Sequence, residues 1–269
     1  RTPPATGARR KPVRAPLTRR QYLITSVITF ILLLAAWTAI STSGLVRPLF
    51  LPSPIAVTEK LIDQGVNGQL WSDIAVSTYR VMVGYLLASV IAVPIGVLCG
   101  SIPRVEAAIE PIMDFIRYMP VVAFVPLTIL WVGTDDSQKV LIIFLGTFFQ
   151  QVLMVADAVR RVPMSYQNLG ATLGLSRTKI LIRIVFPSAL PRIWDALRIS
   201  LGWAWTWLVV AELVAATEGM GYRITQAQRF LETDLIIGYV IVLGLLGLLF
   251  DQVMRGLGRR FFRYLKGRV

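Results

Sequence analysis

The side chains that carry most enzyme chemistry are nearly absent from this sequence. It contains no histidine and a single cysteine, Cys99, which lies inside an apolar run. Such a chain cannot build a disulfide framework, a zinc site of the usual kinds, or a serine–histidine–aspartate triad. It also has no glycine-rich lysine loop of the P-loop type. We therefore expect no catalytic residues, no metal site and no nucleotide site in this chain.

The polar side chains that remain of interest lie within or near apolar runs. In the predicted topology Glu212 is a carboxylate within the membrane, and such a group usually faces a cavity or a partner. It is therefore either a gate or pathway residue or a structural hydrogen-bond acceptor. Gln150 and Gln151 could donate amide hydrogens to an oxyanion or join helices together. Arg80 and Arg198 lie near the ends of runs, where they could snorkel to the interface.

Composition places these residues in a membrane protein. The 269 residues are 55% hydrophobic, with a mean hydropathy of +0.64. Since the runs lack the alternation of barrel strands, they predict helices, each with about the 20 residues that cross a bilayer. The fold class is all-α: a polytopic six-helix domain over residues 21–269 that follows a basic arm at 1–20. The six apolar runs are 22–42, 74–100, 108–132, 140–159, 193–216 and 235–254.

The net charge is +13, and most of the Lys and Arg residues lie in the segments outside these runs. Lys and Arg concentrate before the first run, between the fourth and fifth, and after the last. This asymmetry predicts that both termini are cytoplasmic and that the charge meets the lipid bilayer rather than nucleic acid. On the other side, Ser53 and Pro54 are typical of a helix start, so 55–64 is either a short amphipathic surface helix or a simple connection.

Two of the runs carry residues that could shape a pathway. Pro120 and Pro126 interrupt the third run, which is either a broken helix lining a pore or a kinked packing helix. In the fifth run, Trp203, Trp205 and Trp207 follow one another at two-residue spacing. This spacing spreads them around a helix, so we expect at least one to serve in packing or anchoring.

The basic connection between the fourth and fifth runs, about 160–191, is longer than a helix bundle needs. Residues 164–173 can be helical, Gly174 suits the left-handed position after a helix, and Ser176 suits the next N-cap. The second helix should end at Pro187, with basic residues opposite an apolar stripe. Such a pair either docks into a groove of a soluble partner or lies on lipid. The stripe consists of Ile180, Leu181, Ile184 and Val185.

The spacing of Gly174, Ile184 and Pro187 resembles the cytoplasmic signature loop of ABC importer permeases. That pattern begins with Glu-Ala-Ala, where this chain has Asn168, Leu169 and Gly170, so the acidic residue is absent. Further stretches are similar to the nitrate/sulfonate/taurine/bicarbonate branch of this family, over about 51–263. They are LPSP (51–54), RYMPVVAFVPLTILW (117–131), FLGTFF (144–149), VVAELVAA (209–216) and GLLGLLFD (244–251).

The resemblance implies a permease fold of type I with a coupling helix, in a bacterial inner membrane. It implies a transport subunit, not an enzyme, that pairs with a second copy of itself, two ATP-binding-cassette ATPase subunits and an extracytoplasmic solute-binding protein. ATP and Mg²⁺ would bind to the ATPase subunits. The solute would be a small oxyanion such as nitrate or bicarbonate, or a sulfonate such as taurine. An ion-driven secondary transporter is the alternative, although it leaves the long basic loop unexplained.

Two sets of site residues follow from the resemblance and from the residues themselves. The ATPase-coupling set is Asn168, Leu169, Gly170, Leu173, Gly174, Leu175, Ser176, Arg177, Lys179, Ile184 and Pro187. Arg177 and Lys179 would pair with acidic residues of the ATPase or stay solvated. The translocation-pathway set is Pro120, Pro126, Phe149, Gln150, Gln151, Trp205 and Glu212.

Overall fold

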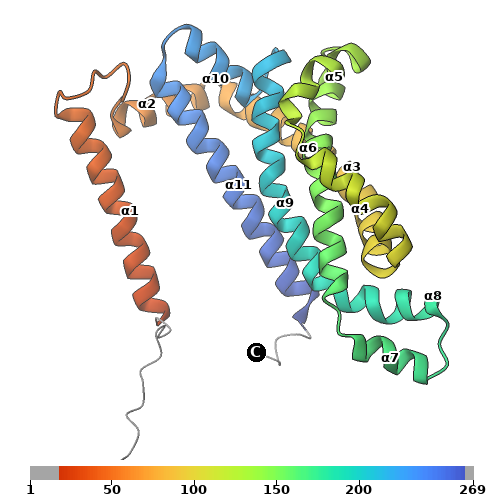
Figure 1. The fold of residues 1–269 in the computed structure, drawn as a ribbon. Coiled ribbons are helices and arrows are strands. Elements are labelled where there is room, and N and C mark those ends of the chain that lie inside the picture. Colours follow the sequence, from red (N-terminus) through yellow and green to blue (C-terminus); the bar gives the residue numbers. More distant parts are fainter. Residues whose placement is uncertain (1–17, 264–269) are drawn as a thin grey trace, which may run out of the picture. The chain divides into compact units, whose positions relative to one another are not determined.

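The computed structural model describes residues 18–263, so most of the basic arm expected at 1–20 lies outside the described residues. The secondary structure within this range is entirely helical (Figure 1). The helices are α1 (Arg19–Thr42), α2 (Pro54–Val66), α3 (Gln69–Ser101), α4 (Pro103–Arg117), η1 (Val121–Phe124), α5 (Val125–Val132), α6 (Asp136–Arg160), α7 (Met164–Thr172), α8 (Arg177–Ile180), the π-helical η2 (Leu181–Val185), α9 (Phe186–Ala215), α10 (Met220–Arg229) and α11 (Thr233–Phe261).

The chain divides into two compact units, and the boundary follows Ala56. The first unit contains α1, whose start is fixed by a capping box: Gln21 N–H donates to Thr18 Oγ1 and Thr18 N–H donates to Gln21 Oε1. Ala56 N–H donates to Ser53 Oγ at 3.2 Å, which confirms the predicted helix start at this serine.

The second unit is built around α3, α6 and α9. Small residues recur at every fourth position of α3, at Gly84, Ala88, Ala92, Gly96 and Gly100, and α6 packs along this stripe. A Cβ on Gly96 would lie 2.6 Å from Val155 Cβ and 2.7 Å from the Val152 carbonyl oxygen. The backbones of α3 and α6 therefore lie so close together that only a glycine fits at this position of α3.

The third apolar run does not form the single helix expected over 108–132. It is divided into α4 and the η1–α5 pair, which are bent by 88° relative to each other. Pro120 has no N–H to continue the helix and disfavours helical geometry at the residue before it. Pro126, in contrast, lies in the first turn of α5, where a proline is tolerated. The prediction that this run is broken is confirmed, and its lining of a pore stays a prediction.

The expectation that Pro187 ends a helix is wrong. Residues Arg177–Val214 form one continuous helical segment through η2 and α9. Within the π-helical turn, Phe186 N–H donates to the Leu181 carbonyl, one residue further back than in an α-helix. Because of this change in the hydrogen-bond pattern, the helix continues through Pro187, which lies in the first turn of α9.

Five described helical segments are long and apolar enough to cross a membrane, or six if α4 and η1–α5 count as one bent span. They are α1, α3, α6, the segment Arg177–Val214 and α11, and all five overlap predicted runs. The short helices α7 and α8 form a hairpin at the end of the second unit where α6 ends and α9 begins (Figure 1). The predicted six-run polytopic organisation is confirmed, apart from the break in the third run.

The close packing of α3 on α6 predicts different effects for two glycine substitutions. Gly96→Ala should lower the free energy of unfolding by about 1–3 kcal/mol, because the methyl group meets backbone and Cβ atoms that cannot move away freely. Gly244→Ala in α11, where a Cβ would meet nothing within 4 Å, is the control and should be neutral or slightly stabilising. The apparent melting temperature of detergent-purified protein measures both, and equal values would contradict the packing argument.

Candidate functional site

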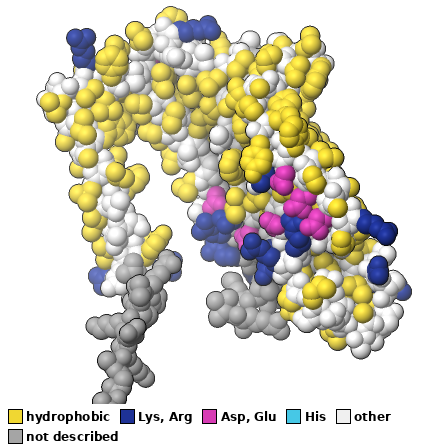
Figure 2. Space-filling model, viewed as in Figure 1, with side chains coloured by type: hydrophobic (Ala, Val, Ile, Leu, Met, Phe, Trp, Pro, Cys, Tyr) yellow, Lys and Arg dark blue, Asp and Glu magenta, His cyan; other side chains and the backbone are white. Residues whose placement is uncertain are grey.

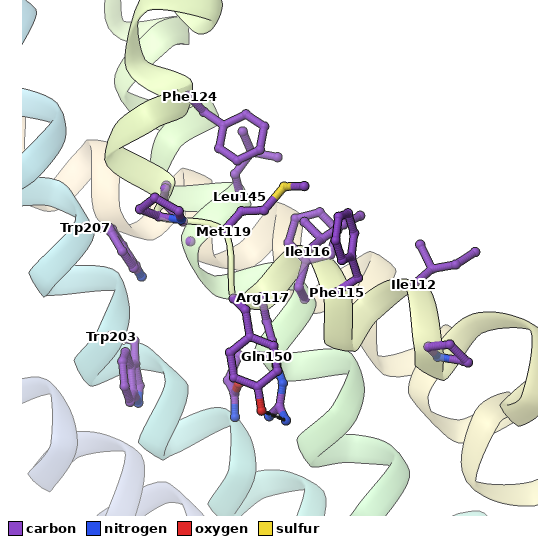
Figure 3. A pocket seen from close by; sticks show the side chains of 16 residues that line it. Ile112, Phe115, Ile116, Arg117, Met119, Phe124, Leu145, Gln150, Trp203 and Trp207 are labelled. Atoms are coloured by element: carbon purple, nitrogen blue, oxygen red, sulfur yellow. Dashed lines mark hydrogen bonds between the residues drawn. The ribbon is translucent and has the colours of Figure 1, made fainter.

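A cavity of about 900 Å³ lies where α4 breaks (Figure 3). Because the chain turns by 88° at this point, α4 and η1 do not fill the space beside α6 and α9. The walls consist mainly of apolar and aromatic side chains from these helices. The lining residues are Pro111, Ile112, Phe115, Ile116 and Arg117 of α4, Tyr118, Met119 and Pro120 of the break, Val121 and Phe124 of η1, Leu145, Gly146, Phe149 and Gln150 of α6, and Trp203 and Trp207 of α9.

Helical periodicity explains which side chains reach this cavity. Trp203 and Trp207 are four residues apart and therefore share one face of α9, which is the face seen in Figure 3. The Trp207 ring lies directly against Gly146 of α6, where a Cβ would be 2.4 Å from a ring carbon. A glycine at this position is thus required for the ring to lie in its present place.

Few polar groups line the cavity. Arg117 Nη2 donates to the Tyr118 hydroxyl at 3.1 Å, and its guanidinium lies 4.9 Å from the centre of that ring. Arg117 Nε is 3.0 Å from Asp114 Oδ1, one turn earlier on α4. Gln150 contributes an amide from α6, and Figure 3 shows its polar end and that of Arg117 extending to the same end of the cavity.

Three of the predicted pathway residues line the cavity, namely Pro120, Phe149 and Gln150. Pro126 lies in the first turn of α5 and does not line it. Arg117, Tyr118, Trp203 and Trp207 also line the cavity and were not predicted to do so. The four-residue spacing of the two tryptophans, which puts both on one side of a helix, was the available signal.

Gln151 and Trp205 have packing contacts instead. Gln151 Nε2 donates to Ser200 Oγ of α9 at 2.8 Å and to Ser89 Oγ of α3 at 3.1 Å, so this amide joins three helices. The buried Trp205 ring packs against Phe250 of α11, with ring centres 5.5 Å apart. The prediction that at least one of the three tryptophans serves in packing is confirmed.

Glu212 lies in a buried ion pair away from the cavity. Its carboxylate is 2.8 Å from Arg80 Nη1 of α3, and it accepts hydrogen bonds from Ser77 Oγ and Gly221 N–H, both at 2.8 Å. Arg80 also pairs with Asp136 at 2.6 Å and is 2% exposed. The expectation that Arg80 snorkels is therefore wrong, because its carboxylate partners come from α6 and α9 rather than from the interface.

A second carboxylate extends this network toward α10. Asp73 of α3 accepts from Tyr239 Oη at 2.8 Å, from Arg223 Nε at 3.1 Å and from Gly219 N–H at 3.2 Å. Gly219 has a φ of +102°, and a Cβ there would lie 2.4 Å from a Glu212 oxygen. The network thus holds the α9–α10 connection against α3. Near the middle of α9, Arg198 donates to Asp251 of α11 at 2.8 Å.

The corner after α7 has the geometry predicted for it. Gly174 has a φ of +72°, its N–H donates to the Ala171 carbonyl at 2.9 Å, and Leu175 N–H donates to the Gly170 carbonyl at 3.1 Å. These two bonds are those of a Schellman motif, which ends a helix at a left-handed glycine. Ser176 has the extended backbone of an N-cap, although its side chain makes no capping bond within the described residues.

The α7–α8 hairpin has an inner and an outer side. On the inner side, Gly170 lies against Ile184 and Ile180, and a Cβ on it would be 2.7 Å from Ile184 Cδ1. Ile184 therefore holds the hairpin together rather than facing outward. On the outer side Leu169 and Leu173, four residues apart, are exposed, and we call these two residues the α7 face. Arg177 and Lys179 are exposed at the start of α8.

An ion cluster links α4 to the start of this hairpin. Arg160, the last residue of α6, is 2.5 Å from Glu106 and 2.7 Å from Glu110, both on α4, and 2.7 Å from Asp157. Figure 2 shows acidic and basic side chains gathered between the hydrophobic surface of the helices and the hairpin. The helix α4, which borders the cavity, is thus ion-paired to the last residue of α6, shortly before α7 begins.

Comparison with known proteins identifies the family. Residues 92–263 match the family described as the binding-protein-dependent transport system inner membrane component. The chain belongs to this family. It is therefore a multi-pass inner-membrane permease, a transport subunit without catalysis of its own. This membership excludes the secondary-transporter alternative.

The curated relatives support the branch that the sequence predicted. The permease is 35% identical to the taurine transport system permease protein TauC of Escherichia coli K12, over 94% of this chain and 93% of TauC. It is 31% identical to the bicarbonate transport system permease protein CmpB of Synechococcus elongatus, over 86% of each chain. A Bacillus subtilis relative named for aliphatic sulfonates transport, SsuC, is 31% identical over 97% of this chain and 93% of its own length.

A solved structure has the same fold. A chain of the inward-facing MetNI methionine ABC transporter superposes with a TM-score of 0.62 at 20% identity, covering 75% of this permease and 98% of that chain. At this identity the likeness concerns the fold alone.

The buried ion pair predicts a coupled loss of stability. Arg80→Gln should cost about 3–5 kcal/mol, because it leaves the buried Glu212 carboxylate without its cation. The double variant Arg80→Gln/Glu212→Gln should lose less than the sum of the two single variants. Arg255→Gln, which breaks an exposed pair with Asp251, is the control and should cost under about 1 kcal/mol. Melting temperatures of the purified variants measure these effects, and strict additivity would contradict the pairing.

Proposed function

We propose that this permease forms the transport pathway of an ATP-driven importer for a small anion, which an extracytoplasmic binding protein delivers. The anion is an oxyanion such as nitrate or bicarbonate, or a sulfonate such as taurine. The names of the relatives, which include taurine, aliphatic sulfonates and bicarbonate, support this class of solute. The chain works as one permease domain from about residue 21, preceded by the basic arm, with both termini in the cytoplasm as the Lys and Arg distribution favours.

The observation that carries this proposal is the α7 face. Leu169 and Leu173 are 60% and 69% exposed on a hairpin whose corner is fixed by the Schellman motif and whose inner side is packed. Covering a leucine fully is worth about 1.5–3 kcal/mol, so a preformed apolar face of this kind favours a groove in a partner. The partner is an ATP-binding subunit, to which ATP and Mg²⁺ bind, while Arg177 and Lys179 reach acidic residues at the rim of the groove.

The other predicted coupling residues do not contact the ATPase in this proposal but shape the hairpin that does. Gly174, Leu175 and Ser176 form the corner itself, Gly170 and Ile184 pack the hairpin together, and Asn168 and Pro187 lie at its margins.

The cavity is the candidate pathway. It is bordered by α4, η1, α6 and α9 of one chain, and we propose that a second copy of the permease supplies the opposite wall. ATP binding moves the two hairpins, and each hairpin moves its α4 through the bonds of Arg160 to Glu106 and Glu110. In this way ATP binding at the partner changes the access to the cavity.

Association with the ATPase tests the proposal. The permease is expressed with the ATP-binding subunit of its own system, and the subunits are purified in mild detergent through a tag on the permease. Leu169→Gln/Leu173→Gln should reduce the ATPase recovered by at least about tenfold, because two apolar contacts are lost. Gly174→Arg should also lose it, since a bulky side chain is strained at this positive φ.

Two variants serve as matched controls. Ile182→Gln changes a side chain of the same 60% exposure outside the α7 face, and Gly174→Asn keeps a residue that tolerates the left-handed conformation. Both should retain the ATPase. If the double leucine variant retains it as well, the hairpin is not the docking element and lies on lipid instead.

The Arg160 cluster predicts uncoupling without dissociation. Arg160→Gln should leave the ATPase bound but lower solute uptake per ATP hydrolysed by about fivefold, because α4 is no longer bonded to the hairpin. Arg161→Gln, which removes an adjacent exposed charge, should leave this ratio unchanged. Reconstituted complexes with labelled solute provide the measurement, and an unaltered ratio in Arg160→Gln would remove this cluster from the mechanism.

A further inference from the structure

The polar lining of the cavity is concentrated in one place. Arg117 is the only charged residue among the side chains known to line it, and Asp114, which pairs with its Nε, is not a lining residue. One hydrogen of Nη2 goes to the Tyr118 hydroxyl. The remaining N–H groups of Nη1 and Nη2 and the Gln150 amide have no hydrogen-bond partner within residues 18–263. The cavity therefore presents a cation and several unused donors to whatever enters it.

Unused donors on a guanidinium and an amide are suited to an oxyanion. Arginine binds such groups through two parallel N–H bonds, and its bonds to anions are about twice as strong as neutral ones. The neighbouring amide can donate a further bond to the same group. The cation also lies beside apolar walls, where weaker screening than in water strengthens the attraction.

The remaining walls are suited to an apolar body. In Figure 3 Trp203 of α9 lies level with the polar ends of Arg117 and Gln150. Trp207 lies one turn further along the same helix, against Gly146. Phe115 and Phe149 line the cavity from α4 and α6. Aromatic faces bind carbon chains, and they attract an ammonium group through cation–π interactions. A small inorganic oxyanion would lose its hydration here without gaining these contacts.

We propose that Arg117 and Gln150 form an anion-binding subsite within the cavity, and that its ligand is a small organic sulfonate. The sulfonate oxygens accept bonds from the Arg117 guanidinium and the Gln150 amide, while the carbon chain lies against Trp203 and Trp207. The permease then selects its solute directly, in addition to any selection by the binding protein. This subsite rests on the proposed function, since it lies in the proposed pathway.

Proteoliposomes that contain the complete complex, with permease, ATPase and binding protein, test the subsite. Uptake is measured with taurine, butanesulfonate, nitrate and bicarbonate as separate probes, together with ATP hydrolysis stimulated by the loaded binding protein. Arg117→Gln should lower uptake of the sulfonates by about tenfold, the effect of losing one charged hydrogen bond in a poorly hydrated site. Arg117→Lys should fall between this variant and the unchanged protein, and Gln150→Glu should resemble Arg117→Gln because it places a negative charge beside the ligand.

Arg104→Gln is the matched control, because Arg104 lies exposed at the other end of the same helix and does not line the cavity. It should leave uptake unchanged. A purely structural role of Arg117 would lower uptake and ATP hydrolysis together, whereas loss of a subsite lowers the uptake per ATP hydrolysed.

The outcomes separate this inference from the proposed function. If the unaltered complex imports sulfonates and Arg117→Gln imports them equally well, the subsite is refuted while the proposed function stands. Import of nitrate or bicarbonate without any sulfonate has the same consequence. If the complex hydrolyses ATP but imports none of the four anions, the proposed solute class itself is wrong.

Discussion

The close approach of α3 and α6 is the constraint on which the second unit depends. Lipid is as apolar as a leucine side chain, so helices within a membrane gain little from hydrophobic burial and associate through contact between their surfaces. The glycines and alanines at every fourth position make this contact possible along the C-terminal half of α3. Gln151 of α6 then bonds to serines of α3 and α9, so the third helix is held to the same pair.

This rigid group of helices contrasts with the broken segment beside it. α4 and η1–α5 meet at Pro120, where the backbone cannot continue a helix, and the bend leaves the cavity between the break and the faces of α6 and α9. A cavity in a membrane protein must be lined by side chains that tolerate both apolar surroundings and a polar solute. Aromatic rings, one arginine and one amide meet that requirement with few groups to desolvate.

Charged residues are used at the two ends of the unit in different ways. At the α10 end, Arg80, Glu212 and Asp73 are buried, fully partnered and tied to the α9–α10 connection, which is the arrangement that makes buried charges tolerable. At the hairpin end, Arg160 and its three carboxylates are partly exposed, so their bonds can break and form at small cost. A fixed end and an adjustable end suit a protein that must transmit movement from one side to the other.

Sequence alone determined the all-helical membrane fold and the glycine corner at Gly174. These properties are local: they depend on run length, on backbone geometry and on which residue types are present. Of the two prolines that interrupt the third run, the structure placed the break at Pro120. Tertiary structure decided that Gln150 faces the cavity while Gln151 joins helices, and that Arg80 meets a carboxylate 132 residues away rather than the interface. The helical period separates neighbouring side chains, but only the packed neighbours decide which direction leads to a cavity and which to a partner.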